Sequence, residues 1–172
     1  MRTNLNPLMS HKRADWETPP ELFEMLDREF HFTVDAAANT ENTLCARWYG
    51  PGGVGEDALE MPWDGVVWCN PPYGPAVANF VDAALFAIGG RIATTVVMLL
   101  PSRTDTRWFH RLAESSHCVF RFMKGRIKFR LHGEPIRDAA HQPVGAPFPS
   151  LIAILAFQQR LCGVQSSFWS ER

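Results

Sequence analysis

The chain has 172 residues, of which 46% are hydrophobic and 20% charged, and its formal net charge is −1. This length suits one domain, and the composition excludes disordered, collagen-like and coiled-coil proteins. No apolar run approaches the roughly 18 to 20 residues that cross a bilayer, and residues 1–16 hold no apolar signal-peptide core, so we expect a cytoplasmic protein.

The first predicted element is a helix in the sequence DWETPPELFEMLDREF. Residues 1–13 before it lack periodicity and predict a flexible tail, followed by a single domain over 14–172. Thr18 and Glu21 match a T-x-x-E capping box, and the two prolines between them suit a first helical turn. Apolar residues at helical spacing predict one buried face, formed by Leu22, Phe23, Leu26 and Phe30.

Two predicted strands end at polar residues. HFTVDAAA favours a short strand that ends at Asp35, and GVVWCN favours an apolar strand that ends at Asn70. Between them we expect a helix over 40–48 and a glycine-rich turn over 50–55. Because ligands of open α/β sheets bind at the carboxyl ends of strands, Asp35 and Asn70 are the first site candidates.

The second half of the chain continues the alternation of helices and strands. A helix over 76–88, a fully apolar strand over 94–101, a helix over 106–115 and a strand over 117–122 are expected in turn. The alternating segment GRIKFRL favours another strand, residues 132–149 favour a long loop, and SLIAILAF favours the last core strand. The pattern predicts an α/β protein with a doubly wound, mostly parallel sheet that ends in an antiparallel hairpin of GRIKF with SLIAIL.

The most specific chemical signal is Asn70-Pro71-Pro72-Tyr73, followed by Gly74. The asparagine oxygen and the first proline's carbonyl can accept both hydrogens of a planar exocyclic amine, which turns the nitrogen lone pair toward an electrophilic methyl group. The prolines restrict the backbone, and the tyrosine ring can stack on a base. The alternative is a proline turn that closes a buried strand. The position of the motif directly after an apolar strand favours methyl transfer.

The chain resembles the phage-type DNA N6-adenine methyltransferases, small enzymes of phages and prophages. Their motifs stand here in order, between about residues 15 and 157: DWETP, VDAAA, DAL with Trp63, NPPYG, LPSRTDTRWFH, GRIKF and the closing strand. The resemblance implies a Rossmann-like methyltransferase fold and transfer of a methyl group from S-adenosyl-L-methionine to adenine N6 of a flipped base in double-stranded DNA. It further implies no metal and a site of action in the bacterial host cytoplasm. The sequence itself gives no sign of a membrane segment or of an obligatory protein partner.

The same resemblance assigns cofactor-binding positions. Asp35 would hold the methionine end of the cofactor, and Asp57 with Ala58 would meet its adenine; the glycine-rich loop usual in methyltransferases is replaced by three alanines from Ala36 onward. The remaining expected contacts are Trp16, Thr18, Pro19, Ala36 and Asn70, and the catalytic group is Asn70, Pro71, Pro72 and Tyr73. Structural alternatives stay open, because Asp35 could cap a turn, Asp57 could be a solvated loop acid and Thr18 could be a helix cap.

Charge is distributed unevenly along the chain. Residues 14–100 hold 13 acidic and 3 basic side chains, whereas residues 101–137 hold 9 basic and 3 acidic ones. A basic segment of this kind indicates a face that meets a polyanion, although a solvated face with nearby counter-charges would look the same. We expect DNA phosphates to be bound by Arg103, Arg107, Lys124, Arg126, Lys128 and Arg130, the last three on one face of a strand.

Reaching a base inside a duplex requires flipping it out, and the long loop over 130–149 is the candidate for strand insertion or sequence reading. A mobile loop without a catalytic role is the alternative. Two other functions remain open: methylation of another planar amine (cytosine N4, an RNA base or a protein glutamine), and an inactive module that only binds nucleic acid.

Overall fold

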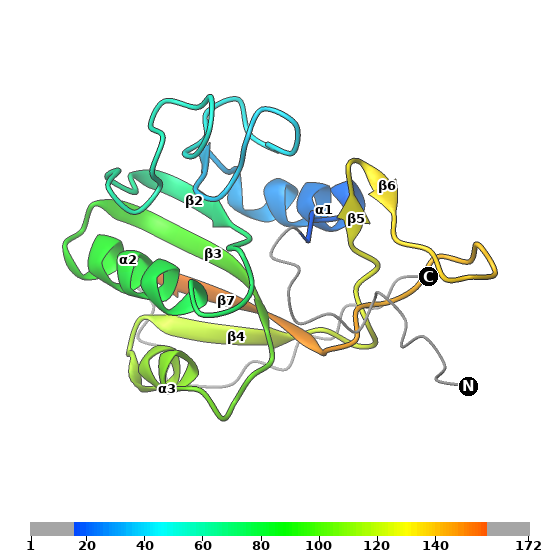
Figure 1. Cartoon of the computed structure of the whole chain (residues 1–172). Coiled ribbons are helices and arrows are strands. Elements are labelled where there is room, and N and C mark those ends of the chain that lie inside the picture. The colour runs from blue at the N-terminus through cyan, green and yellow to red at the C-terminus, as the bar shows by residue number, and fades with distance from the viewer. Residues whose placement is uncertain (1–15, 158–172) are drawn as a thin grey trace.

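A computed structural model describes residues 16–157, and the predicted tail over 1–13 lies outside that range. The described chain is a mixed α/β protein with a five-stranded sheet in the order β1-β2-β3-β7-β4 (Figure 1). β1, β2 and β3 run parallel, and β7 runs antiparallel to both of its neighbours. The elements are α1 (Pro20–Phe30), β1 (Val34–Asp35), β2 (Gly65–Cys69), α2 (Val77–Gly89), β3 (Ala93–Pro101), α3 (Arg107–Glu114), β4 (Cys118–Phe122), β5 (Arg130–Leu131), β6 (Glu134–Pro135) and β7 (Ser150–Ala156).

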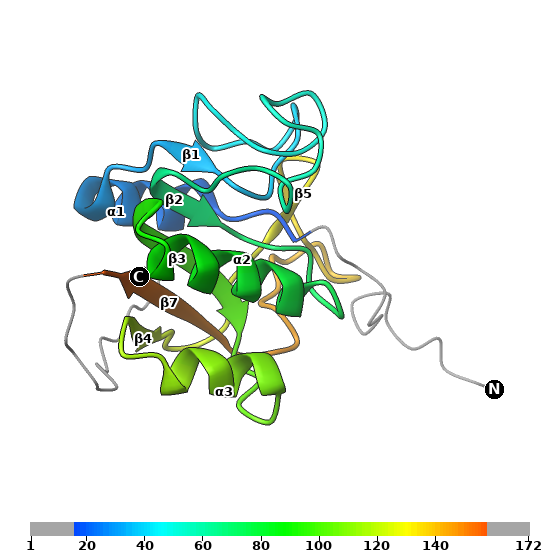
Figure 2. The same ribbon diagram turned by 90° about the vertical axis from the view of Figure 1, so that its left-hand side faces the viewer.

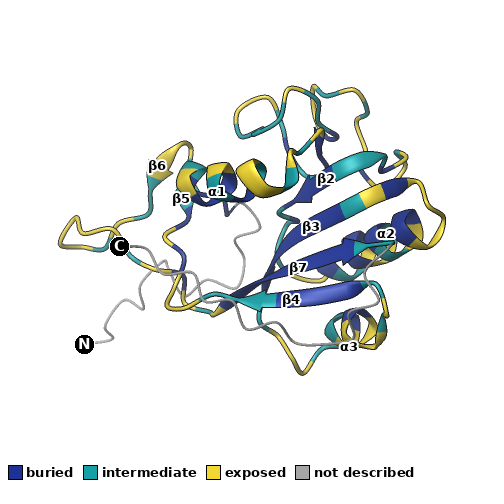
Figure 3. Ribbon diagram, turned by 180° about the vertical axis from the view of Figure 1, so that it is seen from behind, coloured by how far each residue is buried: buried dark blue, intermediate teal, exposed yellow. Residues whose placement is uncertain are grey.

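Helices cover both faces of the sheet, with α1 on one side and α2 and α3 on the other (Figure 2). Neighbouring residues of β3 divide accordingly: Val97 and Leu99 pack with α1, while Val96 and Met98 pack with α2. The central strands are almost entirely buried (Figure 3). The predicted α/β class with a mostly parallel, doubly wound sheet is confirmed, and it is consistent with a Rossmann-like methyltransferase fold.

The start of α1 differs from the predicted capping box. Pro19 is the N-cap and no side chain caps the helix, because the backbone carbonyl of Pro19 accepts the N–H groups of Leu22 and Phe23 directly, at 3.1 and 3.2 Å. Thr18 therefore lies one residue too early to cap. Its prediction as a helix cap is wrong, and its buried side chain faces a pocket instead.

The helix predicted over 40–48 is also wrong. One helical turn forms, closed by the N–H of Thr43 donating to the carbonyl of Asn39 at 3.1 Å. The next N–H, that of Leu44, donates instead to the buried Asp35 carboxylate at 3.3 Å. A carboxylate from the preceding strand thus takes the amide that would have extended the helix. The glycine-rich turn over 50–55 is present as predicted.

The antiparallel pairing at the end of the chain involves different strands from those predicted. β7 lies between β3 and β4 and does not pair with GRIKF. Because both faces of β7 are apolar, a central place in the sheet buries more of it than a hairpin would. Of the predicted strand over 125–131 only β5 forms, and it pairs with β6, so the predicted loop over 132–149 contains part of a protruding hairpin (Figure 1).

Candidate active site

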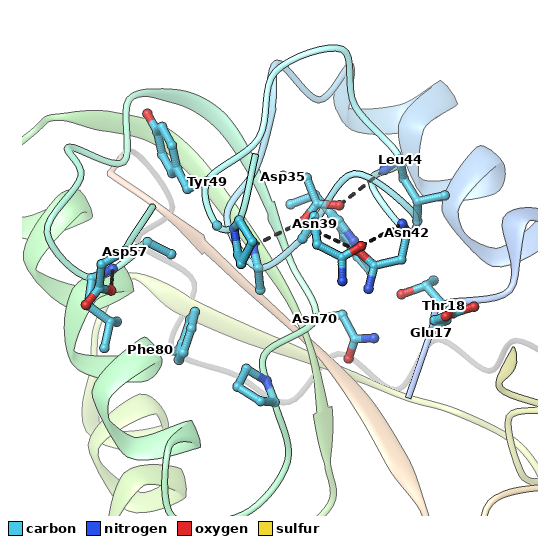
Figure 4. Close-up of a pocket in the computed structure, with 18 of the residues that line it drawn as sticks. Glu17, Thr18, Asp35, Asn39, Asn42, Leu44, Tyr49, Asp57, Asn70 and Phe80 are labelled. Atoms are coloured by element: carbon cyan, nitrogen blue, oxygen red, sulfur yellow. Dashed lines mark hydrogen bonds between the residues drawn. The ribbon is translucent and has the colours of Figure 1, made fainter. Parts of the chain in front are cut away.

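A pocket with a cavity of about 440 Å³ opens at the carboxyl ends of β1 and β2 (Figure 4). This volume is within the usual range of small-molecule sites. The pocket brings together residues that the sequence places far apart, and seven predicted site residues line it: Trp16, Thr18, Asp35, Asp57, Ala58, Asn70 and Pro72. The expectation that strand ends carry the site therefore agrees with the geometry.

Four of the residues predicted to bind the cofactor or take part in catalysis do not line the pocket. Pro19 caps α1, and Ala36 and Pro71 are buried, Ala36 in the core beside α2. Tyr73 packs edge-on against the rings of Phe129 and Phe148, with centroids 5.9 and 5.4 Å away. Its hydroxyl donates to the carbonyl of Leu99 at 3.3 Å, and burial raises its pKa above the usual value. The tyrosine is thus held by the core beneath the site.

Asp35 is a buried carboxylate at the end of β1, with only 3% of its surface exposed. It accepts the backbone N–H groups of Ala37 at 3.2 Å and Leu44 at 3.3 Å. Among residues 16–157 no cationic side chain pairs with it. Burial raises its pKa from 3.8 to about 6, against the opposing effect of the two backbone hydrogen bonds. The site therefore holds an acid that a cationic ligand group would stabilise in its charged form.

Asn70, directly after β2, carries an unused acceptor. Its Nδ2 donates to the carbonyl oxygen of Trp16 at 2.6 Å. Because a carbonyl can only accept, this contact fixes which end of the amide is nitrogen. The Oδ1 atom is buried and has no hydrogen-bond partner among the described residues. Such an atom costs roughly 1–3 kcal/mol of stability, and an N–H from a ligand in the pocket could complete it.

Residues that the sequence reasoning missed complete the walls of the pocket. Asn39 and Asn42 lie at the same end as Asp35, while Phe80 of α2 lies at the far end beside Asp57 (Figure 4). Asp57 is exposed, and its Oδ1 accepts the N–H of Leu59 at 2.8 Å, as a loop acid would. The sequence signal that could have identified the two asparagines is their N-x-x-N spacing, because two polar side chains at this spacing can cap each other's backbone N–H groups, as in a capping box.

Glu17 connects the pocket wall to the β5–β6 hairpin. Its backbone exchanges two hydrogen bonds with Arg130, at 3.1 and 3.0 Å. Its carboxylate accepts the N–H groups of His132 and Gly133 at 2.9 and 2.8 Å. Because Glu17 also lines the pocket, the end of the basic segment is fixed beside the candidate site.

The predicted DNA-binding residues differ in their surroundings, and none of them lines the pocket. Arg130 forms an ion pair with Glu21 at 3.0 Å, and Arg103 forms one with Asp105 at 3.1 Å. Arg126 and Lys128 are exposed, and the alternating Ile127 and Phe129 are buried, as predicted. Exposed positions are also occupied by Arg107 and Lys124.

Two further features concern metals and membranes. Within residues 16–157, no three His, Cys, Asp or Glu side chains come together in a group that could hold a metal ion. Over the same residues, every helix is too short or too polar to cross a membrane.

Comparison with known proteins gives a consistent result. Residues 6–162 match the family model described as DNA N-6-adenine-methyltransferase (Dam). The DNA N-6-adenine-methyltransferase of Escherichia phage T1 is 33% identical over 98 residues, which cover 55% of this chain and 38% of that protein. The protein of the same name from Haemophilus phage HP1 (strain HP1c1) is 30% identical over 134 residues, 75% of this chain and 73% of that protein. The chain thus spans well under half of the first relative and most of the second.

Proposed function

The chain belongs to the DNA N-6-adenine-methyltransferase family, a family of adenine-specific DNA methyltransferases, and on that premise we propose that it transfers a methyl group from S-adenosyl-L-methionine to adenine N6 in double-stranded DNA. The observation that carries this proposal is the buried Oδ1 of Asn70, which lacks a donor within the described chain. We expect the protein to act in the cytoplasm of a bacterial host cell, where that DNA is found.

The pocket residues fit this cofactor. The Asp35 carboxylate, which has no cationic partner among residues 16–157, suits its ammonium group, and the apolar Phe80 with Asp57 at the opposite end suits its adenine. Trp16, Thr18 and Ala58 form further parts of the wall. When bound, the cofactor would supply an electrophilic methyl group: its bond to sulfur breaks as the bond to the base nitrogen forms, S-adenosyl-L-homocysteine is the leaving group, and the nitrogen gives up one proton to solvent. No covalent nucleophile of the protein is needed.

Asn70 would orient the target amine. Its Oδ1 would accept one N6–H, and the backbone carbonyl of Pro71, a buried residue next to the pocket lining, would accept the other, so that the nitrogen lone pair points away from both acceptors. As the nitrogen attacks, its hydrogens become more acidic and both hydrogen bonds strengthen, which stabilises the transition state over the bound base. The 2.6 Å contact from Nδ2 to Trp16 holds the amide in this orientation before DNA binds.

The basic segment would hold the DNA. Arg126 and Lys128 are exposed on the segment that Glu17 fixes beside the pocket, which supports contacts of these side chains with phosphates next to a flipped base. Arg107 and Lys124 would add contacts further along. Arg130 has a structural role in addition, since it pairs with Glu21.

The direct test is Asn70→Ala, with cofactor-dependent transfer of tritium to duplex DNA as the measurement. We expect the rate to fall on the order of a hundredfold or more, while the Kd for the cofactor stays within a few-fold of wild type. Asn79→Ala is the matched control, because Asn79 is exposed and lies outside this pocket. Near-normal turnover of the Asn70 variant would contradict the role assigned to the motif.

The substrate is tested separately. Parallel assays with RNA and protein, and sequencing of modified bases in DNA from cells that express the chain, distinguish N6-methyladenine from N4-methylcytosine and from other amines. Methylation of any of these in place of adenine would overturn the proposed substrate.

A further inference from the structure

Asn39 and Asn42 present two amide groups to the pocket beside Asp35, and the proposed reaction does not yet use them. The Oδ1 of Asn39 accepts the N–H groups of Glu41 at 2.8 Å and Asn42 at 3.2 Å. The Oδ1 of Asn42 accepts the N–H of Asn39 at 2.8 Å. Because both oxygens are occupied by the turn, each amide is held in one orientation, and its NH₂ group is turned away from the turn.

The amide ends of both side chains point into the pocket, above Asn70 (Figure 4). No described residue accepts a hydrogen bond from either Nδ2. This end of the pocket therefore combines one buried carboxylate, that of Asp35, with two donor groups that carry no charge. Asn70, which lines the same pocket, carries one further unpaired group, its acceptor Oδ1.

We propose that Asn39 and Asn42 bind the carboxylate of the cofactor's amino-acid end, while Asp35 binds the ammonium group on the same carbon. The identity of this ligand rests on the proposed function. To bind an α-amino acid, a site needs donors for the carboxylate close to an acceptor for the ammonium group, and the segment from Asp35 to Asn42 supplies both. Neutral donors suit the position, because an arginine or lysine there would pair with Asp35 and remove the charge that the ammonium group needs.

The arrangement makes the two asparagines specificity-determining residues. A ligand with an ammonium group but without a carboxylate would leave both NH₂ groups unpaired in the complex. Wild-type protein should therefore bind S-adenosyl-L-methionine at least about tenfold more tightly than its decarboxylated analogue.

The test is Asn42→Asp, measured by calorimetry with both ligands. An aspartate keeps an oxygen for the N–H of Asn39 and replaces the donor with a second oxygen, which repels a carboxylate. We expect the affinity for S-adenosyl-L-methionine to fall at least about tenfold and the preference over the decarboxylated analogue to disappear. Asn39→Asp, which likewise keeps the acceptor used by the turn, should have the same effect.

Thr40→Asp is the control, since it adds the same charge to the same turn at an exposed residue that does not line the pocket. It should leave the preference between the ligands unchanged. If the wild type and both asparagine variants bind S-adenosyl-L-methionine with the same preference, the inference is wrong and the proposed function stands. If the wild type binds neither ligand, both are overturned.

Discussion

Replacing Asp35 with asparagine separates the effect of this carboxylate on folding from its effect on ligand binding. Burial raises its pKa from 3.8 to about 6, so the folded protein holds the proton more tightly than the unfolded chain does. The resulting stabilisation is fully present below about pH 4 and is lost as the pH rises through about 6. At 1.36 kcal/mol for each pKa unit, the loss is about 3 kcal/mol.

The measurement is the free energy of unfolding from urea denaturation between pH 4 and 8, without cofactor, for wild type and Asp35→Asn. We expect the free energy of unfolding of the wild type, relative to that of the variant, to fall by up to about 3 kcal/mol as the pH rises across this range, because asparagine does not titrate. Glu29 and Asp64, whose pKa values are lowered by Arg121 and Arg47, titrate equally in both proteins and cancel in the difference. The amide also loses one of the two backbone hydrogen bonds, but this cost is the same at every pH.

Cofactor binding should respond in the opposite direction. If the charged Asp35 pairs with an ammonium group, wild-type affinity falls about tenfold for each pH unit below 6, whereas the variant binds weakly at every pH. A difference in unfolding free energy that does not vary with pH would refute the argument that burial raises the pKa of this carboxylate. Normal cofactor binding by the variant would leave Asp35 as a turn-forming residue only.

Two other substitutions test the pocket wall and the basic segment. Gly50→Ala should lower the free energy of unfolding by roughly 2 kcal/mol or more and weaken cofactor binding, because Gly50 has φ +127° and an added Cβ would lie 2.1 Å from the carbonyl oxygen of Ala38. Thermal melting measures the stability and calorimetry measures the cofactor affinity; an alanine variant as stable as the wild type would contradict this prediction. Replacing Arg126 and Lys128 together with alanine should flatten the slope of log affinity for duplex DNA against log salt by up to about 2 units and weaken all sequences alike. An unchanged slope would mean that the two side chains form an ordinary solvated face.

Elements with strong local patterns could be predicted from the sequence. α2 and α3 lie within one residue of their predicted bounds. Their signals are local: glycine ends the helical run of α2, and a threonine N-cap begins α3. The ends of β1 and β2 were found for the same reason. Since ligands bind at these ends, the sequence alone was enough to identify Asp35 and Asn70 as site candidates.

The errors arise where a distant residue decides the local structure. Residues 40–48 have helical character, but the amide of Leu44 is captured by Asp35, nine residues earlier. The segment around Lys128 alternates as predicted because Ile127 and Phe129 enter the core, yet its pairing partner is Glu17, which no local pattern indicates. An apolar run such as β7 predicts burial but not which strands flank it.

The pocket also shows where the sequence departs from what favours folding alone. A protein selected only for stability would not retain a buried carboxylate without a cation at Asp35, or a buried amide oxygen without a donor at Asn70. Each costs stability in the unliganded state, and both costs fall within one cavity. A ligand that supplies a cation to the first group and an N–H to the second recovers these costs as binding energy. On the proposed function the two groups have different partners: the ammonium group of the cofactor would pair with Asp35, and the target amine would donate to Asn70. The hydrogen bonds of the pocket would then be completed only when cofactor and substrate are bound together.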